Sequence, residues 1–200
     1  MNIIEKSYSG TGIIPIETEL ESRRFVFLEG EITQKTADEF TKQILHLSLE
    51  SSDPINILIN SEGGDLDAGL KICDTVSDCP CTVNAYCFGR AYSMAAVIFE
   101  SVNGKRNIVG HSKLMLHQPS ITGMPRQTAG EIEQLSRLMS EKNDLLLSIV
   151  SKRSGIDIKR LKAETANDRY YDAEESVRYG LADAAVAFSE IIGIQHVKGE

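Results

Sequence analysis

The sequence predicts a single α/β domain in which strands alternate with crossover helices. Runs rich in β-branched residues lead repeatedly through a glycine or a polar turn into an amphipathic helix, and this alternation is typical of a parallel sheet covered by helices. The length of 200 residues suits one domain with a full hydrophobic core. No shift in composition divides the chain, and its hydrophobic content of 42% is ordinary for a globular protein.

The N-terminal segment, residues 1–22, is expected to be irregular or mobile. Gly10, Gly12 and Pro15 interrupt it, and residues of these types commonly break regular structure. The compact domain is therefore expected to span residues 23–200.

The first strand-to-helix unit occupies residues 24–49. Its strand, RFVFLEG, ends on a glycine, and Thr33 is a suitable N-cap for the helix that follows. This helix is expected to run to about Leu49, because its apolar side chains recur at helical spacing on one face, at Phe40, Ile44 and Leu47.

Two further units repeat this pattern. A strand over 55–59 leads through a turn at 60–64 into a helix over 66–77. A strand over 82–88 then ends at a glycine and leads into an apolar helix that begins near Ser93.

The second half of the chain predicts one long amphipathic helix flanked by shorter elements. This helix runs from about Gln127 to Lys152, and Gly155 closes it. The other elements are expected to be strands at 106–109 and 113–117, a loop or irregular strand at 119–126, short helices at 157–164 and 173–179, and a last strand near 184–188.

Charge and composition exclude several classes of function. The formal net charge of −8 gives no general attraction for phosphate backbones, so nucleic acid is not an expected partner. No run approaches the ~20 apolar residues that cross a bilayer, and the N-terminus lacks the pattern of a secretion signal. We therefore expect a cytoplasmic protein without a membrane partner.

The cysteines favour a reducing compartment and no metal site. They fall in one short segment, without a C-x-x-C pair or a nearby histidine, at Cys73, Cys79, Cys81 and Cys87. Zinc sites have characteristic ligand spacings, and disulfides need an oxidising compartment. We expect these residues to be small buried hydrophobic side chains.

Ser93, in the segment GRAYSMAA, lies where a buried strand meets an apolar helix. The first N–H groups of a helix lack helical acceptors and form its positive dipole end, so they could stabilise an oxyanion beside this serine. The same position also suits a serine that only caps the helix. The segment is not the G-x-S-x-G motif of the α/β-hydrolases.

Gly63 and Gly64 form a second candidate site between a strand and a helix. Adjacent glycines permit positive φ and a close approach of a ligand to the main chain, so one N–H could face a substrate carbonyl. A simple tight turn would have the same sequence.

His117 is a candidate general base at the end of the apolar run LML. A carboxylate bound to the imidazole would hold its tautomer, but spacing does not choose among Asp168, Asp172, Glu164 and Asp183. Together these groups could supply a nucleophile, a base, an acid and two backbone donors. The chain order would be Ser, His, Asp, which convergent triads allow.

Six blocks of sequence, taken together and in order, resemble the ClpP family, the proteolytic subunits of Clp proteases. The resemblance extends over about residues 22–188 and includes the contexts of Ser93 and His117. The blocks are INSEGG at 59–64, GRAYSMA at 89–95, GKRN at 104–107, LMLHQP at 114–119, NDRY at 167–170 and AEESVRYGLAD at 173–183.

The resemblance implies a role for each matching residue. Ser93 matches the nucleophile of the family's Ser-Met pair, His117 the base of its His-Gln-Pro, and Asp168 the acid. The backbone N–H groups of Gly64 and Met94 match the oxyanion hole. The substrate groove would then include Gly63, Ser120, Ile121, Thr122 and Gly123. Peptidases of this family need no cofactor and no metal.

The resemblance also implies a fold and an assembly. The fold is a ClpP/crotonase-like superhelix of repeated strand-strand-helix units, in a single domain whose long helix from about Gln127 protrudes as a handle. Family members stack two seven-membered rings around a chamber, and an AAA+ unfoldase feeds unfolded polypeptides into it using ATP. Residues 1–22 would form an axial gate and residues 23–200 the serine peptidase domain.

Three departures from the family pattern bear on peptide binding and assembly. Glu62 stands where the family usually has proline, and Ala95 where it often has glycine. The stretch SITGMPR at 120–126 replaces a glycine-rich stretch that lines the groove. Within it, Pro125 has no N–H to donate to a bound strand.

Three other functions share parts of this pattern. A catalytically weak or regulatory ClpP-like subunit of a mixed ring usually lacks a triad residue, whereas all three candidates are present. An acyl-CoA enzyme of the crotonase fold uses two backbone donors but generally has no Ser-His-Asp set. A membrane-associated signal-peptide peptidase would have an anchor, and a lysine base in place of His117.

Overall fold

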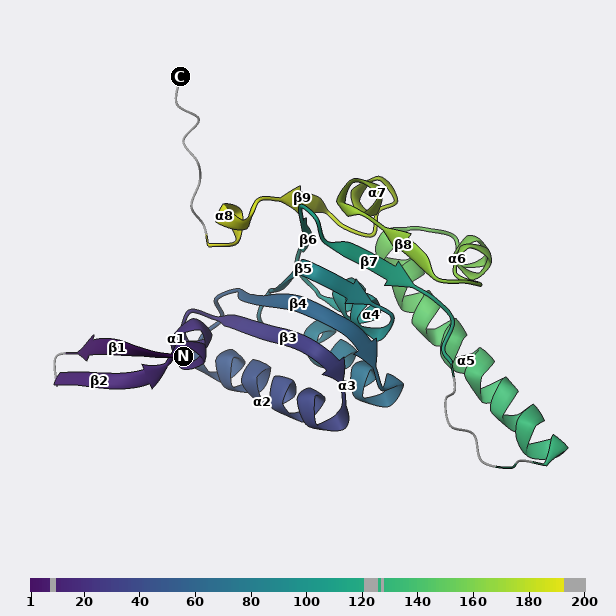
Figure 1. Ribbon diagram of the computed structural model, residues 1–200, viewed down its shortest axis with the longest axis horizontal. Coiled ribbons are helices and arrows are strands. Elements are labelled where there is room, and N and C mark those ends of the chain that lie inside the picture. Colours follow the sequence, from purple (N-terminus) through teal and green to yellow (C-terminus); the bar gives the residue numbers. More distant parts are fainter. Residues whose placement is uncertain (8–9, 121–125, 127, 193–200) are drawn as a thin grey trace, which may run out of the picture.

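The computed structural model describes residues 1–7, 10–120, 126 and 128–192 (Figure 1). The elements in chain order are β1 (Asn2–Ser7), β2 (Gly10–Pro15), α1 (Ile16–Ser22), β3 (Phe25–Ile32), α2 (Gln34–Glu50), β4 (Ile55–Gly64), α3 (Leu66–Ser77), β5 (Val83–Tyr92), α4 (Met94–Ser101), β6 (Arg106–Val109), β7 (Lys113–Leu116), α5 (Ala129–Ser154), α6 (Ile158–Glu164), β8 (Arg169–Tyr171), α7 (Ala173–Arg178), β9 (Ala184–Val186) and α8 (Phe188–Ile191).

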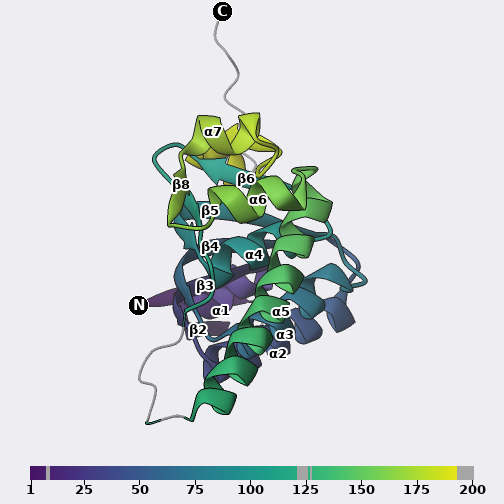
Figure 2. The same ribbon diagram turned by 90° about the vertical axis from the view of Figure 1, so that its right-hand side faces the viewer.

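The main sheet is mostly parallel, as the alternating pattern predicted. In the described part of the chain its strand order is β3-β4-β5-β6-β9, and β7 pairs with both β5 and β8. The β7–β8 pair is antiparallel, and the other pairs of this sheet are parallel. Helices α2, α3, α4 and α5 cover one face of the sheet (Figures 1 and 2). The mixed α/β fold class is confirmed.

The predicted helix signals in the first half of the chain are confirmed. Thr33 caps α2 by accepting the Thr36 N–H at 3.2 Å, and α3 has the predicted bounds. The predicted apolar face of α2 is buried against β3 and α3, with Phe40, Ile44 and Leu47 at most 2% exposed.

The described part of the N-terminal segment has regular structure, so the prediction of an irregular segment was wrong, and its mobility stays a prediction. β1 and β2 pair as an antiparallel hairpin that projects from the sheet domain, and α1 follows it (Figure 1). Its glycines belong to an extended ladder instead of interrupting one; Gly12, for example, pairs with Glu5.

Two further boundaries differ because glycine-rich segments continue in the sheet. The predicted turn at 60–64 is the end of β4, and β5 runs past Gly89 to Tyr92. Both extensions follow points where the strand register slips, which allows glycine backbones to stay paired. The helix predicted from about Gln127 begins at Ala129, and β8 and α8 were not predicted.

The cysteines occupy the buried positions that the sequence predicted, and all of them are free thiols. Burial raises the pKa of both Cys73 and Cys87 to about 12, so these thiols are unreactive at neutral pH. No helix in the described part of the chain is both long and apolar enough to span a membrane.

An ionic cluster lies at the far end of α4 from Ser93. Glu100, 2% exposed, accepts a hydrogen bond of 2.5 Å from Arg106 Nη1, and Arg106 also donates to Asp183 at 2.6 Å. The second carboxyl oxygen of Glu100 has no partner among the described residues. Burial raises the pKa of Glu100 to about 8, although Arg106 and the more distant Arg153 oppose this shift.

We predict that this carboxyl makes stability fall with rising pH. The folded chain holds a proton that the unfolded chain, with a Glu pKa of 4.5, releases at lower pH. The contribution of the Glu100 carboxyl to the free energy of unfolding is complete below pH 4.5 and is lost as the pH rises through about 8. Between these values the free energy of unfolding falls by at most about 1.4 kcal/mol per pH unit. Denaturant unfolding of wild type and Glu100→Gln between these pH values measures how the free energy of unfolding changes with pH.

The variant should flatten the slope, because glutamine does not titrate. Glu133→Gln, which changes an exposed carboxylate on α5, serves as the control and should keep the wild-type slope. An equal slope in wild type and Glu100→Gln would contradict the assignment.

Candidate active site

The candidate residues meet where several strands of the sheet end. β4 ends at Gly64, Ser93 follows β5, and His117 follows β7. These strands are parallel, so their carboxyl ends lie at one edge of the sheet, where α/β proteins commonly bind ligands. Asp168 precedes β8, which is antiparallel to β7, and therefore reaches the same edge.

Strand register places the three polar side chains side by side. β5 pairs with β7 up to Tyr92 opposite Met115, and the Ser93 N–H donates to the Met115 carbonyl at 2.8 Å. β7 pairs with β8 up to Leu116 opposite Arg169. The next residues along these three strands are Ser93, His117 and, in the reverse direction, Asp168.

Ser93 has an unusual backbone conformation for a residue other than glycine, with φ 53° and ψ −123°. Such sparsely populated conformations cost about 1–3 kcal/mol and are concentrated at functional sites. Ser93 precedes α4, yet its hydroxyl makes no capping hydrogen bond. Small residues flank the turn at Ala91 and Ala95, where the α/β-hydrolase motif has glycines.

The hydroxyl of Ser93 instead faces His117. Ser93 Oγ and His117 Nε2 are 2.8 Å apart, within ordinary hydrogen-bond distance. This pair satisfies the main geometric requirement for a serine activated by a base. Neither of the other described histidines faces a serine nucleophile: His46 lies beside Glu50 on α2, and His111 lies in an exposed turn.

Asp168 lies on the other side of the imidazole. Its Oδ1 is 3.4 Å from His117 Nδ1, which is a close ion-pair distance but longer than a typical hydrogen bond. The Asp168 side chain is 55% exposed, whereas that of His117 is 26% exposed. Water therefore screens this contact more than it would screen a buried triad acid.

The three competing carboxylates have other partners. Asp172 caps α7 by accepting the Glu175 N–H, and Asp183 binds Arg106. Glu164 accepts hydrogen bonds from Arg160 and Tyr171. The structure thus separates four acids that spacing left equal.

Gly63 and Gly64 pass through a narrow space between β3 and the Ser93 turn. A Cβ on Gly63 would lie 2.9 Å from Ser93 Cβ and 3.0 Å from Met94 N, and Gly63 has φ 94°. A Cβ on Gly64 would lie 2.2 Å from the Ile32 carbonyl oxygen. Both positions therefore require glycine, and they bring the end of β4 against the first residue of α4.

The predicted groove residues are only partly placed. Gly63 is buried beside Ser93, and Ser120 is exposed without regular structure. Ile121, Thr122 and Gly123 lie outside the described residues, as does Pro125. Among the described residues, no group of three or more His, Cys, Asp or Glu side chains could hold a metal ion.

Two contacts near the nucleophile were missed by sequence reasoning. Glu62, at the position where the ClpP family usually has proline, forms an ion pair of 3.1 Å with Arg90 on β5. Ser61 is fully buried and bonds to two backbone groups. The only sequence signal for Ser61 is a small polar residue two positions after an apolar strand, within the predicted turn.

Comparisons with known proteins identify the family of this chain. A Clp protease family model matches residues 9–188. The proteolytic subunit 4 of the ATP-dependent Clp protease of Rhodococcus jostii (strain RHA1) is 37% identical over 190 residues, covering 93% of this chain and 96% of that protein. Proteolytic subunit 3 of Synechococcus sp. (strain CC9902) is 35% identical over 176 residues, covering 87% and 88%. The chain belongs to the Clp protease family.

Proposed function

We propose that this chain is a serine endopeptidase that hydrolyses peptide bonds of unfolded polypeptides. The observation that carries the proposal is the 2.8 Å contact between Ser93 Oγ and His117 Nε2. Membership of a peptidase family supports the same reaction class.

In this mechanism Ser93 Oγ attacks the carbonyl carbon of the scissile peptide while His117 Nε2 takes the hydroxyl proton. His117 then gives that proton to the leaving amine, and an ester remains on Ser93. Water attacks the ester with His117 as base, which releases the acid product and restores the hydroxyl. Asp168 favours the tautomer with a proton on Nδ1 and stabilises the transient imidazolium.

The backbone N–H groups of Gly64 and Met94 are the proposed oxyanion donors. Met94 is the first residue of α4, where N–H groups have no helical acceptor. The Asp65 N–H donates to the Ile32 carbonyl on β3 at 2.8 Å. Gly64 is the last residue of β4 and directly follows Gly63, which packs on the Ser93 turn, and this proximity supports Gly64 as the second donor.

Exposed apolar side chains on α5 support self-assembly. The amino-terminal half of α5 runs beyond the sheet, with Ile132 50% and Leu138 45% exposed (Figure 1). Exposed apolar residues grouped on one helix commonly mark a contact with another chain. We propose that α5 is a handle between two stacked seven-membered rings in the cytoplasm. In the same assembly, residues 1–22 would form the axial gate.

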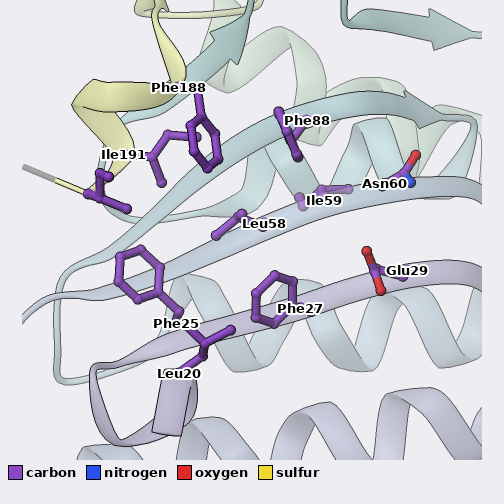
Figure 3. A pocket seen from close by; sticks show the side chains of 11 residues that line it. Leu20, Phe25, Phe27, Glu29, Leu58, Ile59, Asn60, Phe88, Phe188 and Ile191 are labelled. Carbon is purple, nitrogen blue, oxygen red and sulfur yellow. The ribbon is translucent and has the colours of Figure 1, made fainter. Parts of the chain in front are cut away.

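An apolar pocket supports docking of a Clp-type AAA+ unfoldase, which would bind the ATP. The pocket has a volume of about 230 Å³ and lies on the sheet face that carries Phe25 and Phe27 (Figure 3). Val26 and Leu28, which alternate with them, point into the core. At one wall the ring of Phe88 stacks on that of Phe188 at 5.6 Å. An aromatic hollow of this size suits apolar side chains of a partner's loop.

A catalytically weak or regulatory subunit of a mixed ring is the second candidate. The exposed Asp168 and its long contact with His117 favour it, because a screened acid orients the imidazole less firmly. The family model and both relatives are Clp proteases and give no support to an acyl-CoA enzyme.

Covalent labelling tests the nucleophile. A fluorophosphonate probe should add once to wild type, at Ser93, and Ser93→Ala and His117→Ala should each lose the adduct and peptide turnover. Intact mass and peptide mapping measure the adduct. Ser148→Ala, an exposed serine on α5, should react as wild type does. An adduct retained in Ser93→Ala would refute the assignment.

Asp168→Asn should lower kcat about 10- to 100-fold and leave KM nearly unchanged. The loss should be smaller than the ~10⁴-fold found for a buried triad aspartate, because solvent already screens Asp168. Steady-state hydrolysis of a fluorogenic peptide measures both constants. Glu174→Gln, a nearby exposed acid on α7, is the control. A raised KM with unchanged kcat would instead indicate a role in substrate binding.

Phe27→Ser should abolish protein degradation driven by a Clp ATPase from the same genome, without slowing hydrolysis of short peptides. The change removes an apolar wall of the pocket, and Phe27 is 39% exposed, so the core is little affected. Val177→Ser, with 38% exposure on α7, is the matched control. Normal ATPase-driven degradation by Phe27→Ser would exclude this pocket as the docking site.

A further inference from the structure

The backbone ladders on both sides of β4 are interrupted beside the nucleophile. Between β3 and β4 the pairing passes from Glu29–Asn60 to Glu31–Gly63, so it slips around Gly30. Between β4 and β5 it slips directly before the pair Ser61–Ala91. Slips of this kind leave backbone groups without their usual ladder partners.

The hydroxyl of Ser61 bonds to one backbone group on β3 and one on β4, at the point where the register between these strands slips. Ser61 Oγ donates to the Gly30 carbonyl at 2.5 Å and accepts the Gly63 N–H at 3.0 Å. The side chain is 0% exposed, so solvent does not compete with it for these two backbone groups. Buried N–H and C=O groups are costly when unpaired, which makes this hydroxyl a strong local constraint.

The position of Gly63 matters for the oxyanion site. Its Cα packs so closely on the Ser93 turn that an added Cβ would lie 3.0 Å from Met94 N. Gly64, which with Met94 is a proposed oxyanion donor, is the next residue after Gly63. A shift of the 63–64 backbone would therefore move one donor relative to Ser93 and to the second donor.

We propose that Ser61 is a positioning residue that holds Gly63 and Gly64 against the Ser93 turn and thereby sets the geometry of the oxyanion site. This inference deepens the proposed function and rests on it. The hydroxyl acts through the main chain and does not touch substrate. A misplacement of about 1 Å in such a site can cost on the order of 10²-fold in rate.

Kinetics of Ser61→Ala test the inference. We expect kcat for a peptide to fall about 10- to 100-fold with KM within about twofold, because the oxyanion develops only in the transition state. The inhibition constant of a peptide boronate should rise by a similar factor, since one oxygen of its tetrahedral adduct occupies the oxyanion site. Ser61→Cys, which keeps the side-chain shape but has only a weak S–H donor and a weak sulfur acceptor, should show the same pattern if the alanine variant does not fold.

Ser176→Ala is the matched control. Ser176 is also 0% exposed and donates to one backbone carbonyl, that of Asp172, at 2.6 Å, but it lies on α7. It should lose stability without a change in kcat. Equal kcat values for the Ser61 and Ser176 variants, or a raised KM alone, would overturn the inference.

A crystal structure of Ser61→Ala, or of Ser61→Cys, separates this inference from the proposed function. Displacement of Gly63 and Gly64 from the Ser93 turn would support positioning, and an unchanged backbone would overturn it. Wild type that neither hydrolyses peptide nor reacts with the fluorophosphonate would refute the peptidase proposal, while the structural comparison would still decide the role of Ser61.

Discussion

The register of β5 against β7, and of β7 against β8, is the constraint on which the candidate site depends. Pairing up to Tyr92–Met115 and Leu116–Arg169 leaves Ser93, His117 and Asp168 as the next residues at one edge of the sheet. A slip by one residue would turn a core side chain toward the cleft and a triad candidate toward the core. The apolar faces of these strands therefore support the polar site indirectly, because they fix the register that brings its side chains together.

Local chemistry could be predicted from the sequence, and pairing across the chain could not. The cap at Thr33 and the bounds of α3 depend on residues close in sequence, and both were predicted correctly. The 60–64 segment was predicted as a turn because its glycines suit one, but neighbouring strands hold it extended. For the same reason, spacing did not choose Asp168 among four acids: the choice depends on the β7–β8 ladder, which joins residues far apart in the chain.

Buried polar groups are the part of the structure least visible in the sequence. Ser61 lies in a segment that was predicted as a turn and Glu100 in a predicted apolar helix, so only the fold reveals their partners. Both residues lie near an end of α4. Ser61 fixes the backbone beside the amino end of that helix, and Glu100 is buried in its last turn. The side chains along the body of α4 are apolar and buried, whereas side-chain hydrogen bonds restrain the structure around both of its ends.

Solvent exposure of Asp168 links the proposed chemistry to the proposed assembly. The attraction between a carboxylate and an imidazolium grows as water is excluded, because the effective dielectric constant falls. In the single chain Asp168 is half in water, and the exposed apolar residues of α5 are uncovered at the same time. A second copy that covered α5 and restricted water at Asp168 would strengthen the Asp168–His117 contact without moving Ser93. Assembly and orientation of the base would then be coupled by solvent exclusion alone, and no rearrangement of the Ser93 turn would be needed.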